Sequence, residues 1–218
     1  MRIGSYYRYL VLHSLKLPLT GKKILDIGGY DGFLLSRIPG ETKTLIDISP
    51  RSLYPDIHYI EGDFLAFDFK DDKFDLICAF DVIEHVKDDR DFLEKIVHLL
   101  SPEGRALLST PSEKIQIFPS FLQKWVDKKW GHVYRRGYSQ QTLTSMITER
   151  QGKNLDMRIM EWNAQWFRFF YFPLWISWRL WESFTKKILN RIVLSETARQ
   201  DGENGYLFFI LTKKKGDF

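Results

Sequence analysis

The sequence has little that would support disulfide or zinc chemistry. Cys78 is the one cysteine in 218 residues, so no disulfide can form within the chain, and this usage is typical of a reducing compartment. The five histidines are scattered and give no spacing typical of a zinc site. The first 20 residues lack the long apolar run of a secretory signal. We therefore expect a cytoplasmic protein with no bound metal.

The sequence also lacks a long uninterrupted hydrophobic run. Its most aromatic stretch is residues 162–181 (WNAQWFRFFYFPLWISWRLW), in which ten of twenty residues are aromatic. Arg168, Pro173 and Arg179 interrupt this stretch, whereas a membrane-spanning helix needs ~20 predominantly apolar residues. No transmembrane helix is predicted there.

From Leu174 onward the residue spacing instead predicts one amphipathic helix. Its apolar side carries Leu174, Trp178, Trp181, Ile188, Leu189 and Ile192, and its polar side carries Arg179, Glu182, Ser183, Lys186, Lys187 and Asn190. Such a helix either lies on an anionic membrane surface or packs on its own domain or on a second subunit of a homodimer. The aromatic density favours lipid or a lipid-like substrate.

Charge and tryptophan are unevenly distributed along the chain. Residues 1–110 carry 14 basic against 18 acidic side chains, whereas residues 111–218 carry 18 against 10. All seven tryptophans lie in the second half. An acidic first half and a basic, aromatic second half indicate two different tasks within one chain.

Short apolar runs alternate with turn and helix signals along the chain. The expected strands are Lys23–Ile27, Thr44–Asp47, His58–Ile60, Phe74–Ala79, Arg105–Ser109 and Tyr206–Thr212. The expected helices are Ser5–Leu17, Asp88–Leu100 and Ser139–Arg150. This alternation predicts an α/β fold with a parallel sheet built of βαβ units.

A glycine-rich turn, LDIGGYDG, follows the first expected strand. Gly28, Gly29 and Gly32 form G-G-x-x-G instead of the dinucleotide pattern G-x-G-x-x-G, and Tyr30 occupies a place where that pattern needs a small residue. Asp26 ends the strand, and its charge would repel a pyrophosphate but attract a cation. The turn therefore favours S-adenosylmethionine, a cationic nucleoside without phosphate, over a nicotinamide dinucleotide.

Acidic residues end the next two strands as well. Asp47 lies 21 positions after Asp26, where an acid in a βαβ unit accepts hydrogen bonds from ribose hydroxyls. Asp63 and Phe64 follow the third strand, where a carboxylate and an apolar ring suit an adenine. Taken singly, Asp47 could equally cap a helix and Asp63 could be a solvated turn acid.

The fourth strand, in FDLICAFDVIEHV, leads to three further polar side chains. Asp81, Glu84 and His85 come directly after it. Because ligands of parallel sheets bind at the carboxyl ends of the strands, four successive strands present acids to one edge. Their combined spacing predicts a cofactor site there.

The motifs ILDIGGYDGFLL, TLIDIS, EGDF, FDLICAFDVIEHV and LLSPEGRALLSTPS together resemble those of class I S-adenosylmethionine-dependent methyltransferases, and most resemble the small-molecule and quinone-type branch. The resemblance covers residues 20–150 and the final strand. It implies a doubly wound, mostly parallel, seven-stranded Rossmann-like sheet with a final antiparallel strand. A glycine usually stands at the position of Tyr30.

By this resemblance the chain is a single methyltransferase domain. Its expected parts are an N-terminal helix at 1–20, a cofactor-binding core at 21–150, an aromatic helical insertion at 162–200 and a final strand at 206–212. The resemblance places the methionine part of the cofactor against the first strand and the glycine turn, the ribose at Asp47, and the adenine at Asp63 and Phe64. The cofactor-binding candidates are Asp26, Gly28, Gly29, Gly32, Asp47, Asp63, Phe64 and Asp81.

Two histidines are the candidates for a general base. His85 follows the fourth strand, and His132 lies in KKWGHVYRRGYS, where the family places a loop that covers the substrate. His85 could instead order a loop, and His132 could belong to a basic surface loop. The expected wall of the acceptor pocket comprises Glu84, Tyr134, Arg135 and Tyr138.

The favoured function is in-line methyl transfer from S-adenosylmethionine to a small-molecule or lipid-linked acceptor, at the inner face of the membrane where lipid is involved. A second hypothesis is an RNA methyltransferase, motivated by the basic, aromatic second half, although no RNA-binding module is recognisable. DNA is not an expected partner. A third hypothesis is a silent binding or scaffold protein that keeps the cofactor pocket.

Overall fold

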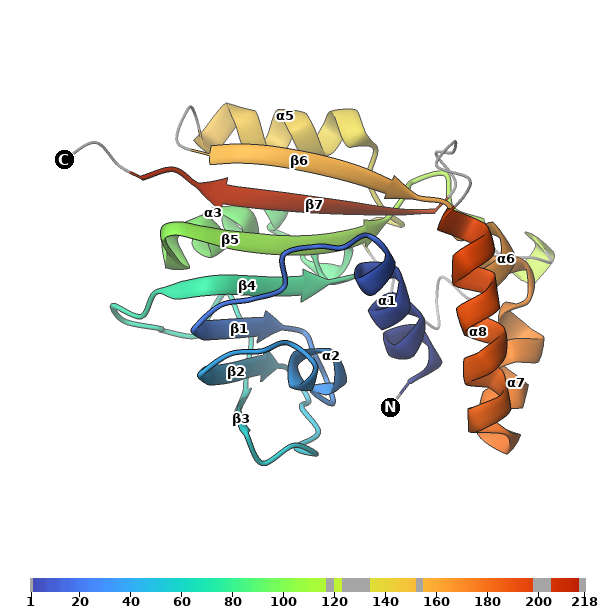
Figure 1. Ribbon diagram of the computed structural model, residues 1–218. Helices are drawn as coiled ribbons and strands as arrows, with labels where there is room; N and C mark the ends of the chain where they lie inside the picture. The colour runs from blue at the N-terminus through green and yellow to red at the C-terminus, as the bar shows by residue number, and fades with distance from the viewer. Residues whose placement is uncertain (1, 117–119, 123–133, 152–154, 198–204, 216–218) are drawn as a thin grey trace.

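Seven strands form one sheet in the order β3-β2-β1-β4-β5-β7-β6. In this computed structural model the chain is described over residues 2–116, 120–122, 134–151, 155–197 and 205–215 (Figure 1). β7 runs antiparallel to both of its neighbours, while the pairs among β1–β5 are parallel. The predicted doubly wound, mostly parallel sheet with an antiparallel final strand is confirmed.

Each predicted strand lies within an observed one, although β5 begins at Leu100 and not at the predicted Arg105. The observed strands are β1 (Lys23–Ile27), β2 (Thr42–Asp47), β3 (Ile57–Glu61), β4 (Phe74–Phe80), β5 (Leu100–Pro111), β6 (Leu155–Trp162) and β7 (Tyr206–Lys213). β6 was not predicted from its residues, because its burial alternates along LDMRIMEW and it lies at the edge of the sheet. An edge strand that is only partly buried on one face has a weak hydrophobic pattern in the sequence.

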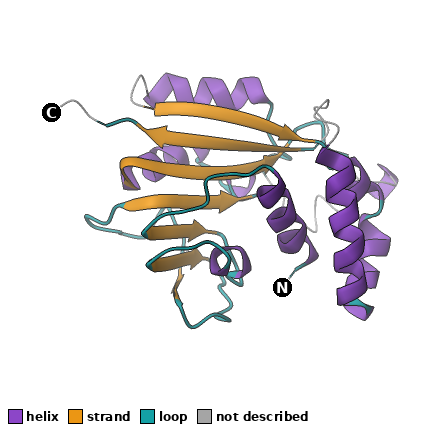
Figure 2. Ribbon diagram, in the orientation of Figure 1, coloured by secondary structure: helices purple, strands orange, loops and turns teal. Residues whose placement is uncertain are grey.

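Helices cover both faces of the sheet (Figure 2). The helices are α1 (Ile3–Ser14), α2 (Phe33–Ser36), α3 (Asp89–Leu99), α5 (Gln140–Gln151), α6 (Gln165–Phe169), α7 (Tyr171–Leu180) and α8 (Glu182–Thr197). One core cluster joins α1, α2 and the helices α6–α8 to the sheet, and a second joins α3 and α5 to its other face. The protein therefore has two hydrophobic layers, one on each side of the sheet.

The aromatic insertion is helical, but its segment from Leu174 onward is not the one continuous helix that the spacing predicted. It consists of α6, α7 and α8, and the chain leaves helical geometry at Trp181 (φ −141°, ψ 64°) between α7 and α8. Pro173 is accommodated in the first turn of α7, where its missing N–H is not needed. The insertion stands beside the carboxyl ends of the parallel strands (Figure 1). None of the helices in the described ranges is both long enough and apolar enough to cross a membrane.

The break at Trp181 changes which side chains are buried. Leu174, Trp178, Leu189 and Ile192 of the predicted apolar side are buried, but the side chain of Trp181 is 64% exposed. Trp178 packs against Tyr6 of α1, with ring centroids 5.5 Å apart. Most of the side that the aromatic density favoured for lipid contact is thus buried within the protein, partly against α1.

Candidate active site

Two cavities meet at the carboxyl edge of the parallel strands. One, here called the strand-end cavity, has a volume of about 680 Å³ and is walled by the segments that follow β1–β4. The other, here called the aromatic cavity, has a volume of about 620 Å³ and is walled by α1, α7 and the glycine turn. Five residues line both cavities: Arg2, Ile27, Gly28, Tyr30 and Asp81. These volumes suit ligands of small-molecule size.

The glycine turn lies between the two cavities, and its backbone conformation is unusual. Gly28 has φ +71° and Tyr30 has φ +51°, so both lie in the left-handed region. A Cβ on Gly28 would come within 2.6 Å of Cγ2 of Val82, so only glycine fits there. Tyr30 accepts the left-handed conformation, and the guanidinium of Arg2 stacks 3.6 Å from the centroid of its ring.

Asp26 is a buried carboxylate that lines the aromatic cavity at the end of β1. Among the described residues its Oδ1 atom has no hydrogen-bond partner. Burial is the largest of the influences that together raise the pKa of Asp26 to about 8; Arg8 opposes the rise, and the charges of Asp47 and Asp31 add to it. Gly29 is required beside it, because a Cβ there would lie 2.2 Å from Oδ2 of Asp26. A cation bound here would satisfy the carboxylate.

Asp47 lines the strand-end cavity and organises its rim. Its Oδ2 accepts a hydrogen bond from the N–H of Tyr30 at 3.0 Å, and its Oδ1 accepts one from the N–H of Ser49 at 2.8 Å. Because each carboxylate oxygen has two lone pairs, both oxygens can still accept bonds from a ligand. The carboxylate therefore couples the glycine turn to the floor of the cavity.

Asp63 and Phe64 form the far wall of the strand-end cavity. Oδ1 of Asp63 accepts a hydrogen bond from the N–H of Leu65 at 2.8 Å, which fixes the turn after β3. Phe64 is buried and packs edge-to-face on Phe92 at 5.2 Å. The wall thus combines an exposed acid with a firmly held ring, which suits a planar polar ligand.

Asp81 follows β4 and borders both cavities. Its backbone is left-handed (φ +53°), although it is not a glycine. Its Oδ1 accepts a hydrogen bond from the hydroxyl of Ser109 at 2.7 Å, and its N–H donates to the carbonyl of Ser109 at 2.9 Å. Its Oδ2 forms an ion pair with the guanidinium of Arg8 from α1. Aspartate tolerates this geometry better than most residues, and such geometry is enriched at functional sites.

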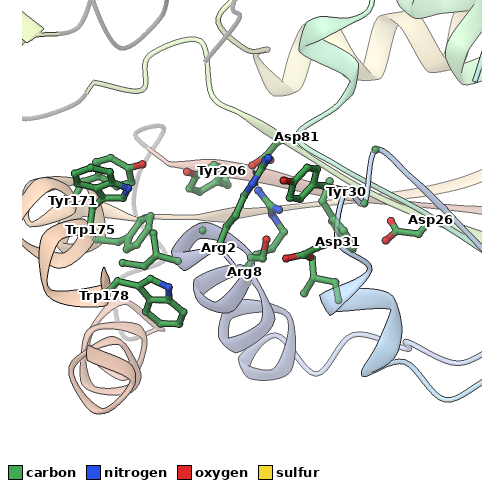
Figure 3. A pocket seen from close by; sticks show the side chains of 18 of the residues that line it. Arg2, Arg8, Asp26, Tyr30, Asp31, Asp81, Tyr171, Trp175, Trp178 and Tyr206 are labelled. Atoms are coloured by element: carbon green, nitrogen blue, oxygen red, sulfur yellow. Dashed lines mark hydrogen bonds and ion pairs between the residues drawn. The ribbon is translucent and has the colours of Figure 1, made fainter. Parts of the chain in front are cut away.

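Aromatic side chains from α6, α7 and β7 close one end of the aromatic cavity. They are Phe167, Tyr171, Trp175, Trp178 and Tyr206. Figure 3 shows the α7 rings at one end and the acids of the glycine turn at the other, with Arg2, Arg8 and Asp81 between them. The cavity therefore has an apolar end lined by aromatic rings and, next to it, a polar end lined by charged side chains.

The structure distributes the predicted acceptor and catalytic residues differently. His85 and Tyr134 line the strand-end cavity, and neither lines the aromatic cavity. Glu84 is fully buried behind the site and accepts a hydrogen bond from the hydroxyl of Thr110 at 3.2 Å. Burial, followed by the charge of Asp81, raises the pKa of Glu84. The predicted single wall of acceptor residues is thus divided between two places.

Arg135 and Tyr138 hold the chain together and line neither cavity. Both bind Asp89 at the start of α3: Arg135 through an ion pair and Tyr138 through a hydroxyl hydrogen bond of 2.9 Å. Tyr138 is buried in the second core cluster. Gly32 (φ +72°) precedes α2 and likewise lines neither cavity. His132 lies outside the described residues.

Several residues of the aromatic cavity carried no recognisable signal in the sequence. Arg2 and Arg8 belong to the N-terminal segment, and Tyr206 begins the last strand. A single arginine within an amphipathic helix normally marks the solvated face, so nothing distinguishes Arg8 before the helix is docked. The contact of Arg8 with Asp81 joins positions 73 apart.

Comparisons with known proteins agree with this geometry. The family model described as "Methyltransferase domain" matches residues 4–162. Two curated relatives are ubiquinone biosynthesis O-methyltransferases, the mitochondrial one from Schizosaccharomyces pombe (35% identical over 112 residues) and one from Xylella fastidiosa (29% over 119 residues). These matches cover 44% and 48% of this chain, and 40% and 48% of the relatives, so the chain spans less than half of their length.

A solved structure matches over nearly the whole chain. The phosphoethanolamine N-methyltransferase 2 of Haemonchus contortus, in complex with phosphomonomethylethanolamine and S-adenosylhomocysteine, superposes with a TM-score of 0.63. The match covers 96% of this chain and 52% of that one at 16% identity, which establishes a shared fold. With the family model matched over most of its length, the chain belongs to the methyltransferase domain family.

Proposed function

We propose that the protein is an S-adenosylmethionine-dependent methyltransferase that acts on a small aromatic acceptor, either free or linked to a lipid. The observation that carries the proposal is the buried Asp26, whose Oδ1 lacks a partner among the described residues and whose pKa is raised to about 8. The ammonium of the cofactor would let this buried carboxyl release its proton and ionise, whereas a pyrophosphate would add further negative charge beside it.

The strand-end cavity fits the remainder of the same cofactor. Asp26 and the backbone of Gly28 would hold the methionine part, Asp47 the ribose hydroxyls, and Asp63 with Phe64 the adenine. In this arrangement the cofactor runs from one cavity to the other across the wall formed by Gly28, Tyr30 and Asp81. When bound, it supplies an activated methyl group.

The aromatic cavity supports a small acceptor. Its rings match a planar or conjugated molecule, and its polar end adjoins the wall that both cavities share. Two relatives that carry the name ubiquinone biosynthesis O-methyltransferase support a quinone-type aromatic acceptor over RNA. Holding the acceptor against the methyl donor supplies much of the rate in such transfers.

Isothermal titration with S-adenosylmethionine and NAD tests the cofactor assignment. We expect micromolar-range affinity for the first and negligible heat with the second. A methyl-labelled cofactor incubated with catechols and with metabolite extracts, followed by mass spectrometry, tests turnover. Tighter binding of NAD would overturn the cofactor assignment, and cofactor binding without label transfer to any acceptor would support the silent scaffold.

We also propose that the exposed end of the α7–α8 pair contacts an anionic membrane surface. This apolar tip consists of Ile176, Leu180, Trp181 and Phe184, which are more than half exposed. The exposed cations Lys187 and Arg191 lie three and seven positions after Phe184 and share its face of α8. Rings entering the headgroup region and cations above them suit anionic lipid, at about 1 kcal/mol per cation.

The residues of this surface differ from those that the sequence predicted. Trp178 packs on Tyr6, and Lys186 pairs with Glu182 at 2.6 Å, so neither is available to lipid. We expect sedimentation with phosphatidylglycerol vesicles that salt weakens and that Trp181→Ser with Phe184→Ser abolishes. The matched control is Leu194→Ser, an exposed leucine of the same helix ten positions beyond Phe184. A wild type that stays in solution as a dimer would make the tip a subunit interface.

A further inference from the structure

We propose that Asp81 and Arg8 form the pair that activates the acceptor: Asp81 takes the proton of an aromatic hydroxyl, and Arg8 holds the resulting oxyanion. This inference rests on the proposed methyl transfer and assigns the acceptor as a phenol or catechol. It gives a catalytic task to a residue that the sequence suggested only for cofactor binding. It also gives one to an N-terminal helix that had none.

Asp81 lies where the methyl group must pass. A methyl group can pass between the two cavities only where they meet, and the shared wall consists of Arg2, Ile27, Gly28, Tyr30 and Asp81. Asp81 is the one carboxylate among these five residues. Its side chain is about one-fifth exposed, so it remains within reach of a ligand.

Asp81 is also held in one orientation. The hydroxyl and carbonyl of Ser109 on β5 bind its Oδ1 and its N–H at 2.7 and 2.9 Å. These contacts maintain a left-handed backbone that a non-glycine residue adopts only at a cost. A carboxylate fixed in this way loses little entropy when it accepts a proton from a bound hydroxyl.

Arg8 supplies the complementary charge. Its guanidinium forms an ion pair with Oδ2 of Asp81 and lies 5.8 Å from the centroid of the Phe80 ring. A guanidinium presents five donors, so Arg8 can bind Asp81 and an acceptor oxygen together. Its charge stabilises an oxyanion directly beside the carboxylate that takes the proton.

The charged and titratable groups around this pair come from several elements. Arg2 and Arg8 belong to the N-terminal segment, Asp26 and Asp31 to β1 and its turn, Glu84 to the segment after β4, and Tyr206 to β7. Burial, followed by the charge of Asp81, raises the pKa of Tyr206 above its ordinary value. Tyr206 therefore stays protonated at neutral pH and does not compete with Asp81 as a base.

The chemical step balances as follows. The O–H bond of the acceptor breaks and its proton goes to a carboxylate oxygen of Asp81. The acceptor oxygen forms a bond to the methyl carbon, and the electron pair of the broken carbon–sulfur bond stays on sulfur. Asp81 returns the proton to solvent when the methylated product leaves. No metal and no redox partner is needed for this balance.

Ionisation of a bound probe tests the pair without turnover. The probe is 4-nitrocatechol, whose visible absorption reports its ionisation, titrated into the protein saturated with S-adenosylhomocysteine. We expect the bound probe to have its pKa lowered by about one unit or more, as a neighbouring guanidinium does. Arg8→Met should lose this effect, whereas Asp81→Asn should enlarge it because a repelling charge is removed. Arg37→Met, an exposed arginine stacked on Phe33, is the control that should match the wild type.

Turnover provides an independent readout. On catechol, Asp81→Asn should lower kcat by about 10²–10⁴-fold, the usual contribution of a general base. On 4-nitrocatechol, which is largely ionised near neutral pH, the loss should be far smaller. Cofactor affinity should change only a few-fold in Asp81→Asn.

The outcomes separate this inference from the proposed function. If the protein does not bind S-adenosylhomocysteine, the proposed function itself fails. If it binds S-adenosylhomocysteine but 4-nitrocatechol does not bind, or if Arg8→Met keeps the lowered probe pKa, the activating pair is wrong and cofactor binding stands. Equal losses of kcat on the two catechols would likewise overturn the role of Asp81 as a base.

Discussion

The two cavities that meet at Asp81 are built on different principles. The strand-end cavity is assembled mainly from short segments that each follow a parallel strand, so most of its polar groups are fixed by the sheet itself. The aromatic cavity depends on α1 and on the α6–α8 insertion, which dock onto the sheet from distant parts of the chain. The first is suited to a ligand that does not change, and the second to an acceptor that differs between relatives.

The two regions also differ in the interactions that hold them to the rest of the protein. β1, β2 and β4 are joined by backbone ladders, whereas α1 and the insertion are joined by side chains. Tyr7 donates a 2.5 Å hydrogen bond to Glu196 of α8 and accepts one of 2.9 Å from the indole N–H of Trp162. Changes in the strand-end cavity should therefore affect ligand binding, and changes in the docked helices should affect stability as well.

The largest effect is expected from Asp26→Asn. This change removes the buried carboxyl that ionises beside the ammonium of a bound cofactor, and we expect affinity to fall by about 100-fold or more, near the ~3 kcal/mol typical of breaking a buried charge pair. Isothermal titration at neutral pH measures it. Unchanged affinity would mean that the cofactor ammonium lies elsewhere.

The same variant has a second, opposite consequence. The folded chain holds the pKa of Asp26 at about 8 against 3.8 for an ordinary aspartate, mainly through burial. Between those values the folded protein keeps a proton that the unfolded chain has released, so stability without cofactor falls as pH rises through this window. At about pH 8, Asp26→Asn should therefore be more stable than the wild type by a few kcal/mol. Urea unfolding at several pH values would show this, and a pH-independent difference would contradict it.

Two neighbouring tryptophans of the insertion should differ strongly in their contribution to the free energy of unfolding. Trp178 is buried against α1, and Trp178→Ala should cost about 3 kcal/mol or more in the free energy of unfolding. Trp181 is 64% exposed, and Trp181→Ala should change it by no more than about 0.5 kcal/mol. Similar losses for both would mean that α7 and α8 pack as the single predicted helix.

The sequence was sufficient to predict the main lining of the strand-end cavity, because that lining consists of residues next to the strands in the sequence. Each acid follows an apolar run, and parallel strands bring their carboxyl ends to one edge. Asp47, Asp63 and Phe64 line that cavity as a consequence of strand order alone. Packing between distant segments adds only Arg2, Phe92 and Tyr134 to this lining.

The aromatic cavity was not predictable in the same way. The 3.6-residue period continues through Trp181 in the sequence, but the backbone does not continue as a helix there. Arg8 acquires its place only when α1 docks next to β4, and Arg135 and Tyr138 are drawn to Asp89 instead. The positions of these side chains depend on which tertiary contacts form, and the periodicity of the sequence does not contain that information.

A smaller effect is expected from Asp47→Ala. The change leaves two ribose hydroxyls without a charged acceptor, and we expect cofactor affinity to fall by roughly 1–3 kcal/mol. It also frees the N–H groups of Tyr30 and Ser49, so Asp47→Asn, which keeps one acceptor oxygen, should lose less. Titration of both variants measures the difference. If both bind like the wild type, Asp47 serves only to shape the turn.

The smallest effect is expected at His85. This histidine lines the strand-end cavity, not the aromatic one, and its Nε2 lies 4.0 Å from Oε1 of the buried Glu84. Because the acceptor hydroxyl is expected on the other side of Asp81, His85→Ala should lower kcat by less than about tenfold, below the ~10²–10⁴-fold typical of a general base. Steady-state rates on catechol, compared with those of Asp81→Asn at the same pH, decide between the two residues. A loss at His85 as large as the loss at Asp81 would place proton removal on the cofactor side of the wall, and the division of labour between the two cavities would then be wrong.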